Sequence, residues 1–107
     1  MKVHVNPSPA LSVVLTCIAT DALPDMSLVT ASRILVRHNS GAEVVWETTV
    51  DAVSPTRRVV RHRYVSGEDF VDVGAYTLRV EHDTPTGTVA SKNVLTIEVV
   101  PKWTTIP

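Results

Sequence analysis

Apolar and polar residues alternate with a period of two along most of this chain. The pattern is clearest at residues 75–82, where Tyr76, Leu78 and Val80 share one side and polar residues separate them. Such alternation is typical of strands with one buried face, and the 3.6-residue period of an amphipathic helix is absent. We therefore predict an all-β domain with about seven strands, at residues 2–5, 11–18, 31–38, 43–50, 58–65, 75–82 and 93–100.

The same alternation predicts which side of each strand faces the core. In residues 31–38 the inward side carries Ile34 and Val36. The inward residues of two other predicted strands are Leu11, Val13, Leu15 and Cys17 in the first, and Val60, His62 and Tyr64 in the second. The Asn-Ser-Gly sequence at 39–41 favours a tight turn, so the flanking strands are expected to form a hairpin. Residues 83–87 are expected to form a longer hairpin turn.

Length and composition limit the organisation of the chain. The 107 residues suit one domain, so residues 1–107 are treated as a single sandwich. Pro7 and Pro9 stop the first strand, so we expect an extended N-terminal arm at 1–9 and a C-terminal tail at 101–107. The net charge of −1 creates no overall field that would attract nucleic acid, and no apolar run is long enough to span a membrane. We therefore expect neither nucleic acid nor a membrane as a partner.

Five residues carry a resemblance to the immunoglobulin fold. They are Cys17, Asp72, Gly74, Tyr76 and Leu78. Residues 11–17 resemble the second strand of such domains, and residues 72–78 contain the Asp-x-Gly-x-Tyr element of the tyrosine corner. The resemblance implies an antiparallel β-sandwich in which the tyrosine hydroxyl bonds to upstream backbone.

Two features of this sequence depart from the immunoglobulin pattern. Leu78 stands where the second disulfide cysteine is expected, and the third strand has no tryptophan. Cys17 is the only cysteine, so no disulfide can form within the chain. A reduced Cys17 can still fill core space as a small apolar side chain.

A second resemblance concerns the role of the protein. The order of an alternating strand, an Asn-Ser-Gly turn, a Glu-Val-Val-Trp strand and the Asp-x-Gly-x-Tyr element is similar to small sandwich domains of bacteriophage structural proteins. The resemblance implies a virion protein made in the host cytoplasm, foremost a capsid decoration or cement protein. Its partners would be a capsid or tail protein and further copies of itself, as a dimer or trimer. Two alternatives stay open: a tail or baseplate accessory module, and a bacterial cell-surface or periplasmic adhesion or binding module.

The sequence offers no pattern that predicts catalysis, a metal or a cofactor. The four histidines lie on different predicted elements without ligand spacing, and no Gly-x-Ser-x-Gly or glycine-rich phosphate loop is present. Cys17 falls on a predicted core strand, where a thiol is usually inert. The acidic cluster of Glu68, Asp69 and Asp72 is assigned to a turn in preference to a calcium site. We therefore expect a non-enzymatic protein.

The candidate interface consists of two groups of residues. The first, Arg57, Arg58, Arg61 and Arg63, is expected to make one side of a strand basic. That side could dock an acidic protein or phosphates, or its charges could keep a sheet edge from pairing with another chain. No aromatic residues alternate with these arginines, as a single-stranded nucleic acid site would require. The second group, Trp103 and Ile106, lies in the proline-bounded tail, where little of the domain remains to bury it.

Overall fold

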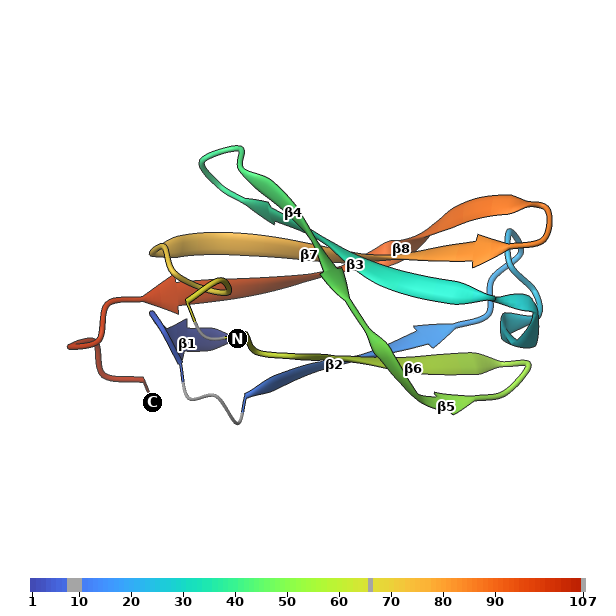
Figure 1. The fold of residues 1–107 in the computed structure, drawn as a ribbon, viewed down its shortest axis with the longest axis horizontal. Helices are drawn as coiled ribbons and strands as arrows, with labels where there is room; N and C mark the ends of the chain where they lie inside the picture. The colour runs from blue at the N-terminus through green and yellow to red at the C-terminus, as the bar shows by residue number, and fades with distance from the viewer. Residues whose placement is uncertain (8–10, 66, 107) are drawn as a thin grey trace.

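Two β-sheets pack face to face in the computed structural model, which describes residues 1–7, 11–65 and 67–106 without the side chains of 92 and 93 (Figure 1). The five-stranded sheet has the order β1 (Lys2–His4), β8 (Gly87–Val100), β7 (Gly74–Thr84), β3 (Ala31–His38) and β4 (Glu43–Glu47). The three-stranded sheet has the order β2 (Ser12–Ile18), β6 (Arg57–Arg63) and β5 (Thr49–Val53). A single 3-10 turn, η1 (Met26–Leu28), lies between β2 and β3. The prediction of an all-β chain is confirmed.

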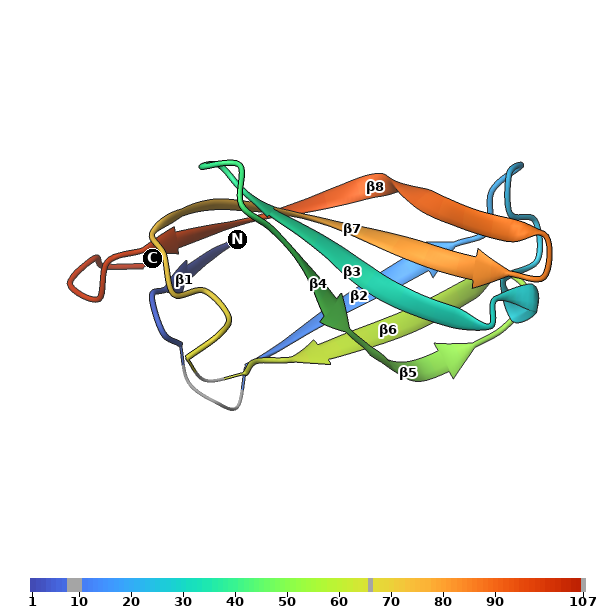
Figure 2. The same cartoon turned by 45° about the horizontal axis from the view of Figure 1, so that its top comes forward.

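The strand predicted at 43–50 is in fact two strands that belong to different sheets. β4 pairs with β3 in the five-stranded sheet, whereas β5 pairs with β6 in the three-stranded sheet. Figure 2 shows the chain crossing from one layer to the other between them. The hydroxyl of Thr48, at the crossing, donates a hydrogen bond to the carbonyl of Ser32 over 2.7 Å. The segment contains neither glycine nor proline, so the local sequence does not mark the break.

The N-terminal residues form part of the larger sheet. β1 pairs with β8 in parallel, with Lys2 opposite Glu98, and the amide of Val5 donates to the carbonyl of Val100 over 2.8 Å. The expectation of an antiparallel β-sandwich is therefore confirmed only in part, since the parallel pair β1–β8 makes this sheet mixed. The predicted arm, residues 1–9, begins as an edge strand, and its residues 8 and 9 lie outside the described part of the chain.

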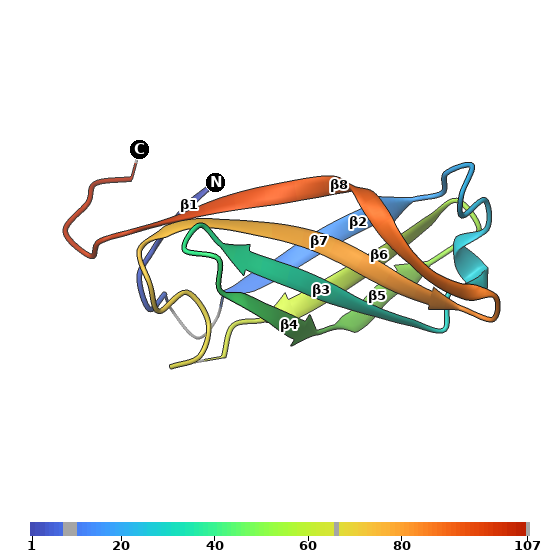
Figure 3. The same ribbon diagram turned by 90° about the horizontal axis from the view of Figure 1, so that it is seen from above.

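The β7–β8 hairpin is longer than the sequence pattern predicts, as Figure 3 shows from above. Thr84 pairs with Gly87, so only residues 85 and 86 form the turn where a five-residue turn was expected. The hydroxyl of Thr84 accepts from the amide of Thr86 and donates to the carbonyl of Gly87, which closes the turn. Gly87 has a φ of +143°, a conformation open to glycine but rarely to other residues. Strand pairing therefore continues to Thr84 and Gly87, next to the turn.

The core lies between the two sheets and is built from the inward side of each strand. Ile34, Val60, Leu78, Ile97 and Val99 have no exposed surface. Burying side chains of this size stabilises the fold by about 1.5–3 kcal/mol each. Val36 is buried as well, as the alternation predicts. At one end of the core, three rings meet edge to face: Trp46 on Phe70, and Phe70 on Tyr76.

Candidate protein-interaction surfaces

The outer side of the three-stranded sheet carries three arginines on β6. In Figure 1 this sheet is the lower layer, and no described element covers its outer side. Arg57, Arg61 and Arg63 alternate with inward residues and are exposed. On the neighbouring strand β2, Val14 lies opposite Arg61 and Ile18 lies opposite Arg57. These two apolar side chains are 44% and 63% exposed. We call these five residues the arginine face.

The arginine face has an excess of positive charge. Arg61 pairs with Asp51 at 3.0 Å. Arg57 and Arg63 have no carboxylate within ion-pair distance among the described residues. A guanidinium is always charged and presents several hydrogen-bond donors. Arg57 and Arg63 can therefore bind an external carboxylate without first breaking an ion pair. Val14 and Ile18 on β2, beside these arginines, would be buried by the same partner.

Arg58 does not belong to this surface, and its assignment to the candidate interface is wrong. Adjacent residues of a strand point to opposite sides, so Arg58 faces inward when Arg57 faces outward. It is buried, and its Nε donates to the hydroxyl of Ser32 over 2.8 Å while Nη1 donates to the carbonyl of Val29 over 3.3 Å. Burial lowers the pKa of this guanidinium because the charged form loses water.

Arg58 is part of a buried polar cluster between the sheets. Since its Nε can only donate, the hydroxyl hydrogen of Ser32 is directed to Nδ1 of His82, 2.8 Å away. Burial, assisted by the charge of Arg58, lowers the pKa of His82, which favours the neutral imidazole. Burial also raises the pKa of Cys17, which lines a 40 Å³ cavity together with His82. A raised pKa favours the thiol of Cys17 over the thiolate, which is the nucleophilic form.

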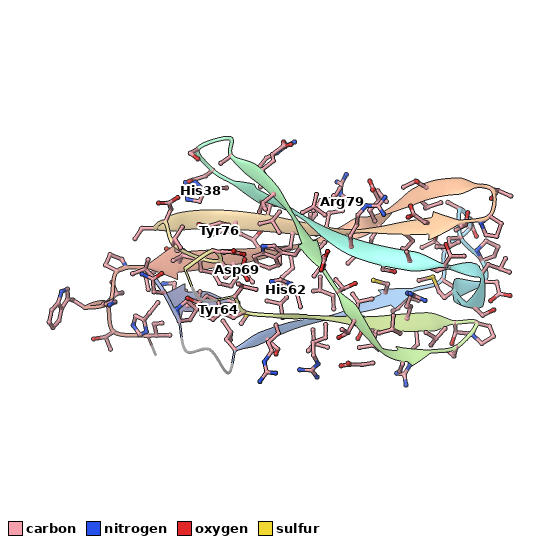
Figure 4. The ribbon with its side chains drawn as sticks, in the orientation of Figure 1. His38, His62, Tyr64, Asp69, Tyr76 and Arg79 are labelled. Carbon is pink, nitrogen blue, oxygen red and sulfur yellow. The ribbon has the colours of Figure 1, made fainter. Side chains whose placement is uncertain are left out.

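A second buried polar pair joins His62 on β6 to Asp69. His62 Nε2 lies 2.7 Å from Asp69 Oδ2, and its Nδ1 lies 2.8 Å from the carbonyl of Glu47 (Figure 4). The same Asp69 oxygen accepts from the amide of Val65, and the ring of Trp46 stacks on His62 with centroids 4.3 Å apart. The pair connects the loop after β6 to the end of β4.

The acidic residues expected in the turn after β6 do not converge on one point. Asp69 is buried against His62, whereas Glu68 and Asp72 are exposed. Within the described part of the chain, no three His, Cys, Asp or Glu side chains are placed to hold a metal ion. Asp69 instead joins the turn to β6 through His62 and to the amide of Val65.

Tyr76 makes the backbone contacts expected from the Asp-x-Gly-x-Tyr element. Its hydroxyl donates to the carbonyl of Asp72 over 3.2 Å and accepts from the amide of the same residue over 3.3 Å. Gly74 has a φ of +134°, and a Cβ added there would lie 2.7 Å from side-chain atoms of His38 and Asn39. Asp72 thus takes part through its backbone. The positive φ favours glycine at 74, and a Cβ there would require the side chains of His38 and Asn39 to move.

A groove on the outer side of the five-stranded sheet was not foreseen from the sequence. Val45, Leu35, Arg79 and Val94 lie opposite one another on four neighbouring strands and line a depression of about 370 Å³. Figure 4 places Arg79 on the outer side of this sheet. Alternation predicts that Arg79 points outward, but only the strand register shows which residues lie beside it.

Most other charges on this outer side neutralise each other. Arg33 pairs with both Glu81 and Asp83, and Arg37 pairs with Glu43. Hydrogen bonds from Arg33 lower the pKa of Asp83. This side of the molecule therefore differs from the arginine face, where positive charge is in excess.

The two tail residues of the candidate interface have different surroundings. Trp103 is 97% exposed, whereas Ile106 is half-buried beside the N-terminal strand. His4 Nε2 lies 2.7 Å from the carbonyl of Thr104, and the amide of Thr104 donates to the carbonyl of Pro101. These two hydrogen bonds hold the tail in a turn against β1.

Comparison with known proteins gives no identification: no family model, curated protein or solved structure matches this chain. None of the helices among the described residues is long and apolar enough to cross a membrane.

Proposed function

We propose that this chain is a non-enzymatic, immunoglobulin-like sandwich that attaches to an acidic surface of a larger protein assembly. The observation that carries the proposal is the arginine face, where Arg57 and Arg63 lack a carboxylate and stand beside exposed apolar side chains. Charge-assisted bonds from arginine to carboxylate are among the stronger polar contacts, and apolar neighbours add burial.

The strand order supports the immunoglobulin-like assignment. β2, β6 and β5 form one sheet, and β8, β7, β3 and β4 are neighbours in the other. A variable-type immunoglobulin domain distributes its strands in this way, and the Tyr76 contact with Asp72 lies at the position of its tyrosine corner. The chain differs in lacking the inter-sheet disulfide.

The setting that we favour for this attachment is a bacteriophage particle. A sandwich with one exposed binding surface, the arginine face, suits a capsid decoration or cement protein. Such a protein binds a repeated surface and catalyses no reaction. A tail or baseplate accessory module is the nearest variant. A bacterial cell-surface or periplasmic adhesion module is the alternative from another class.

The first test locates the protein in its source material. Particles are separated on a density gradient, and the tryptic peptide of residues 38–57 is quantified by mass spectrometry against the main shell protein. Decoration predicts that the peptide bands with particles near shell-protein stoichiometry, and a tail or baseplate module predicts a few copies per particle. A peptide found only in soluble or envelope fractions would contradict the particle setting.

A second test asks whether the arginine face makes the contact. Isotope-labelled chain is added to the recovered particles, and its bound fraction is measured for the wild type, for Arg61→Glu/Arg63→Glu, and for Arg79→Glu. The double variant should bind at least about tenfold more weakly, because like charges now face the acidic surface, and added salt should weaken the wild type. Arg79→Glu is the matched control on the opposite sheet and should bind as the wild type does. Equal binding by all three chains would contradict the proposed face.

A further inference from the structure

We infer that two copies of this chain pair reciprocally at their terminal ends, each placing Trp103 in a groove between β1 and the C-terminal tail of the other. The groove, of about 610 Å³, is lined by residues of both chain ends. The inference concerns a different region from the arginine face and does not depend on the proposed attachment.

Trp103 is poorly placed to fill the groove of its own chain. Lys102 and Ile106, on either side of it along the tail, both line the groove, whereas Trp103 is 97% exposed. The turn that carries it is held by the His4 contact with the Thr104 carbonyl. A large amphipathic ring is therefore presented to the outside at the end of the molecule where both termini lie (Figure 1).

The groove has the chemistry that an indole ring requires. Its apolar lining includes Val5, Pro7, Leu11 and Ile106. Lys2 and Lys102 also contribute to its lining, so two of its residues carry positive charge. A lysine over the face of tryptophan is attracted to the ring electrons, and the apolar lining removes the rest of the ring from water.

Because the ring and the groove occupy the same end of one chain, pairing through both is self-complementary. Two copies related by a two-fold axis can exchange tryptophans, and the pair is then closed. Two buried indoles contribute roughly 300–500 Å² of their own surface, with a comparable area of groove. The total lies below that of a standard stable interface, so we expect a reversible pair that forms as concentration rises.

The test is sedimentation velocity of the purified full chain over a concentration series, with intrinsic fluorescence recorded in parallel. The wild type should approach twice the 11.6 kDa of one chain, with a blue shift of the Trp103 emission as the ring leaves water. Trp103→Ala should weaken pairing at least about tenfold, since a tryptophan anchor of this kind dominates a small interface. Leu28→Ala, which removes an exposed apolar side chain in η1 at the opposite end, is the matched control and should pair as the wild type does.

A second variant tests the groove itself. Ile106→Glu keeps Trp103 but places a carboxylate in the apolar lining, so it should also weaken pairing and reduce the concentration-dependent blue shift. A wild type that stays at one chain mass over the whole series, or pairing by Trp103→Ala as strong as that of the wild type, would overturn the inference. Arg61→Glu/Arg63→Glu should pair normally, so failure of this inference and failure of the proposed attachment are separable.

Discussion

The two sides of β6 give arginine opposite surroundings within one strand. Arg58, on the inward side, is buried and bonded to Ser32 and Val29. Arg61 and Arg63, on the outward side, are exposed, and Arg61 has only a surface ion pair. The comparison shows that side-chain direction, and not the number of adjacent basic residues, decides whether an arginine is available to a partner.

The first prediction concerns the inward arginine and has the largest expected effect. Arg58→Ala should lower the free energy of unfolding by about 2–3 kcal/mol, because it leaves the Val29 carbonyl without its donor and opens a cavity. Arg58→Met keeps most of the volume and removes a buried charge, so its loss should be smaller. Urea unfolding at pH 7 measures both. A loss within error for Arg58→Ala would show that this buried cluster does not stabilise the fold.

The second prediction uses pH to test the surroundings of the inward arginine. Because burial and Arg58 lower the pKa of His82, the unfolded chain binds this proton more readily than the folded chain. Stability due to His82 is therefore fully present above its unfolded value near 6.5 and is lost as pH falls from there towards the folded value. The slope from this one group is at most about 1.4 kcal/mol per pH unit.

His82→Gln provides the comparison for that experiment. Urea unfolding of both chains between about pH 7.5 and 5.5 should show a shallower loss of stability for His82→Gln, because a glutamine has no proton to gain in this range. Parallel curves for the two chains would mean that His82 contributes nothing to the acid sensitivity.

The third prediction concerns the outward arginines and has the smallest expected effect on stability. Arg57→Ala and Arg63→Ala should each change the free energy of unfolding by less than about 0.5 kcal/mol, because exposed side chains without partners lose little on truncation. The same urea titration applies. A loss as large as that of Arg58→Ala would remove the distinction between the two sides of β6.

Strands and faces that depend on local alternation were predictable from the sequence. β3 has the bounds expected at 31–38, and Ile34, Val60 and Leu78 face the core as their spacing indicates. Features that depend on distant segments were not predictable. The break at Thr48 arises because the flanking strands β4 and β5 join different sheets. No residue type in this segment indicates the break.

The candidate surfaces divide in the same way. The outward direction of Arg61 and Arg63 follows from alternation, and the same rule applied consistently would have placed Arg58 inside. The groove beside Arg79 and the burial of Asp69 against His62 arise from pairing between strands and a loop far apart in sequence. Such contacts become visible only when the register is known.

The parallel pairing of β1 with β8 also affects how the domain resists unfolding by a force applied to its two ends. Tension applied through the two chain ends pulls the start of β1 and the end of β8 in opposite directions along their shared axis. The hydrogen bonds between them, including those from Val5 to Val100 and from Glu98 to Met1, are then strained together in shear. Tension on the free ends of a hairpin opens its bonds one at a time. Pairing of the short strand β1 with β8 should therefore raise the force needed to unfold the domain by its ends.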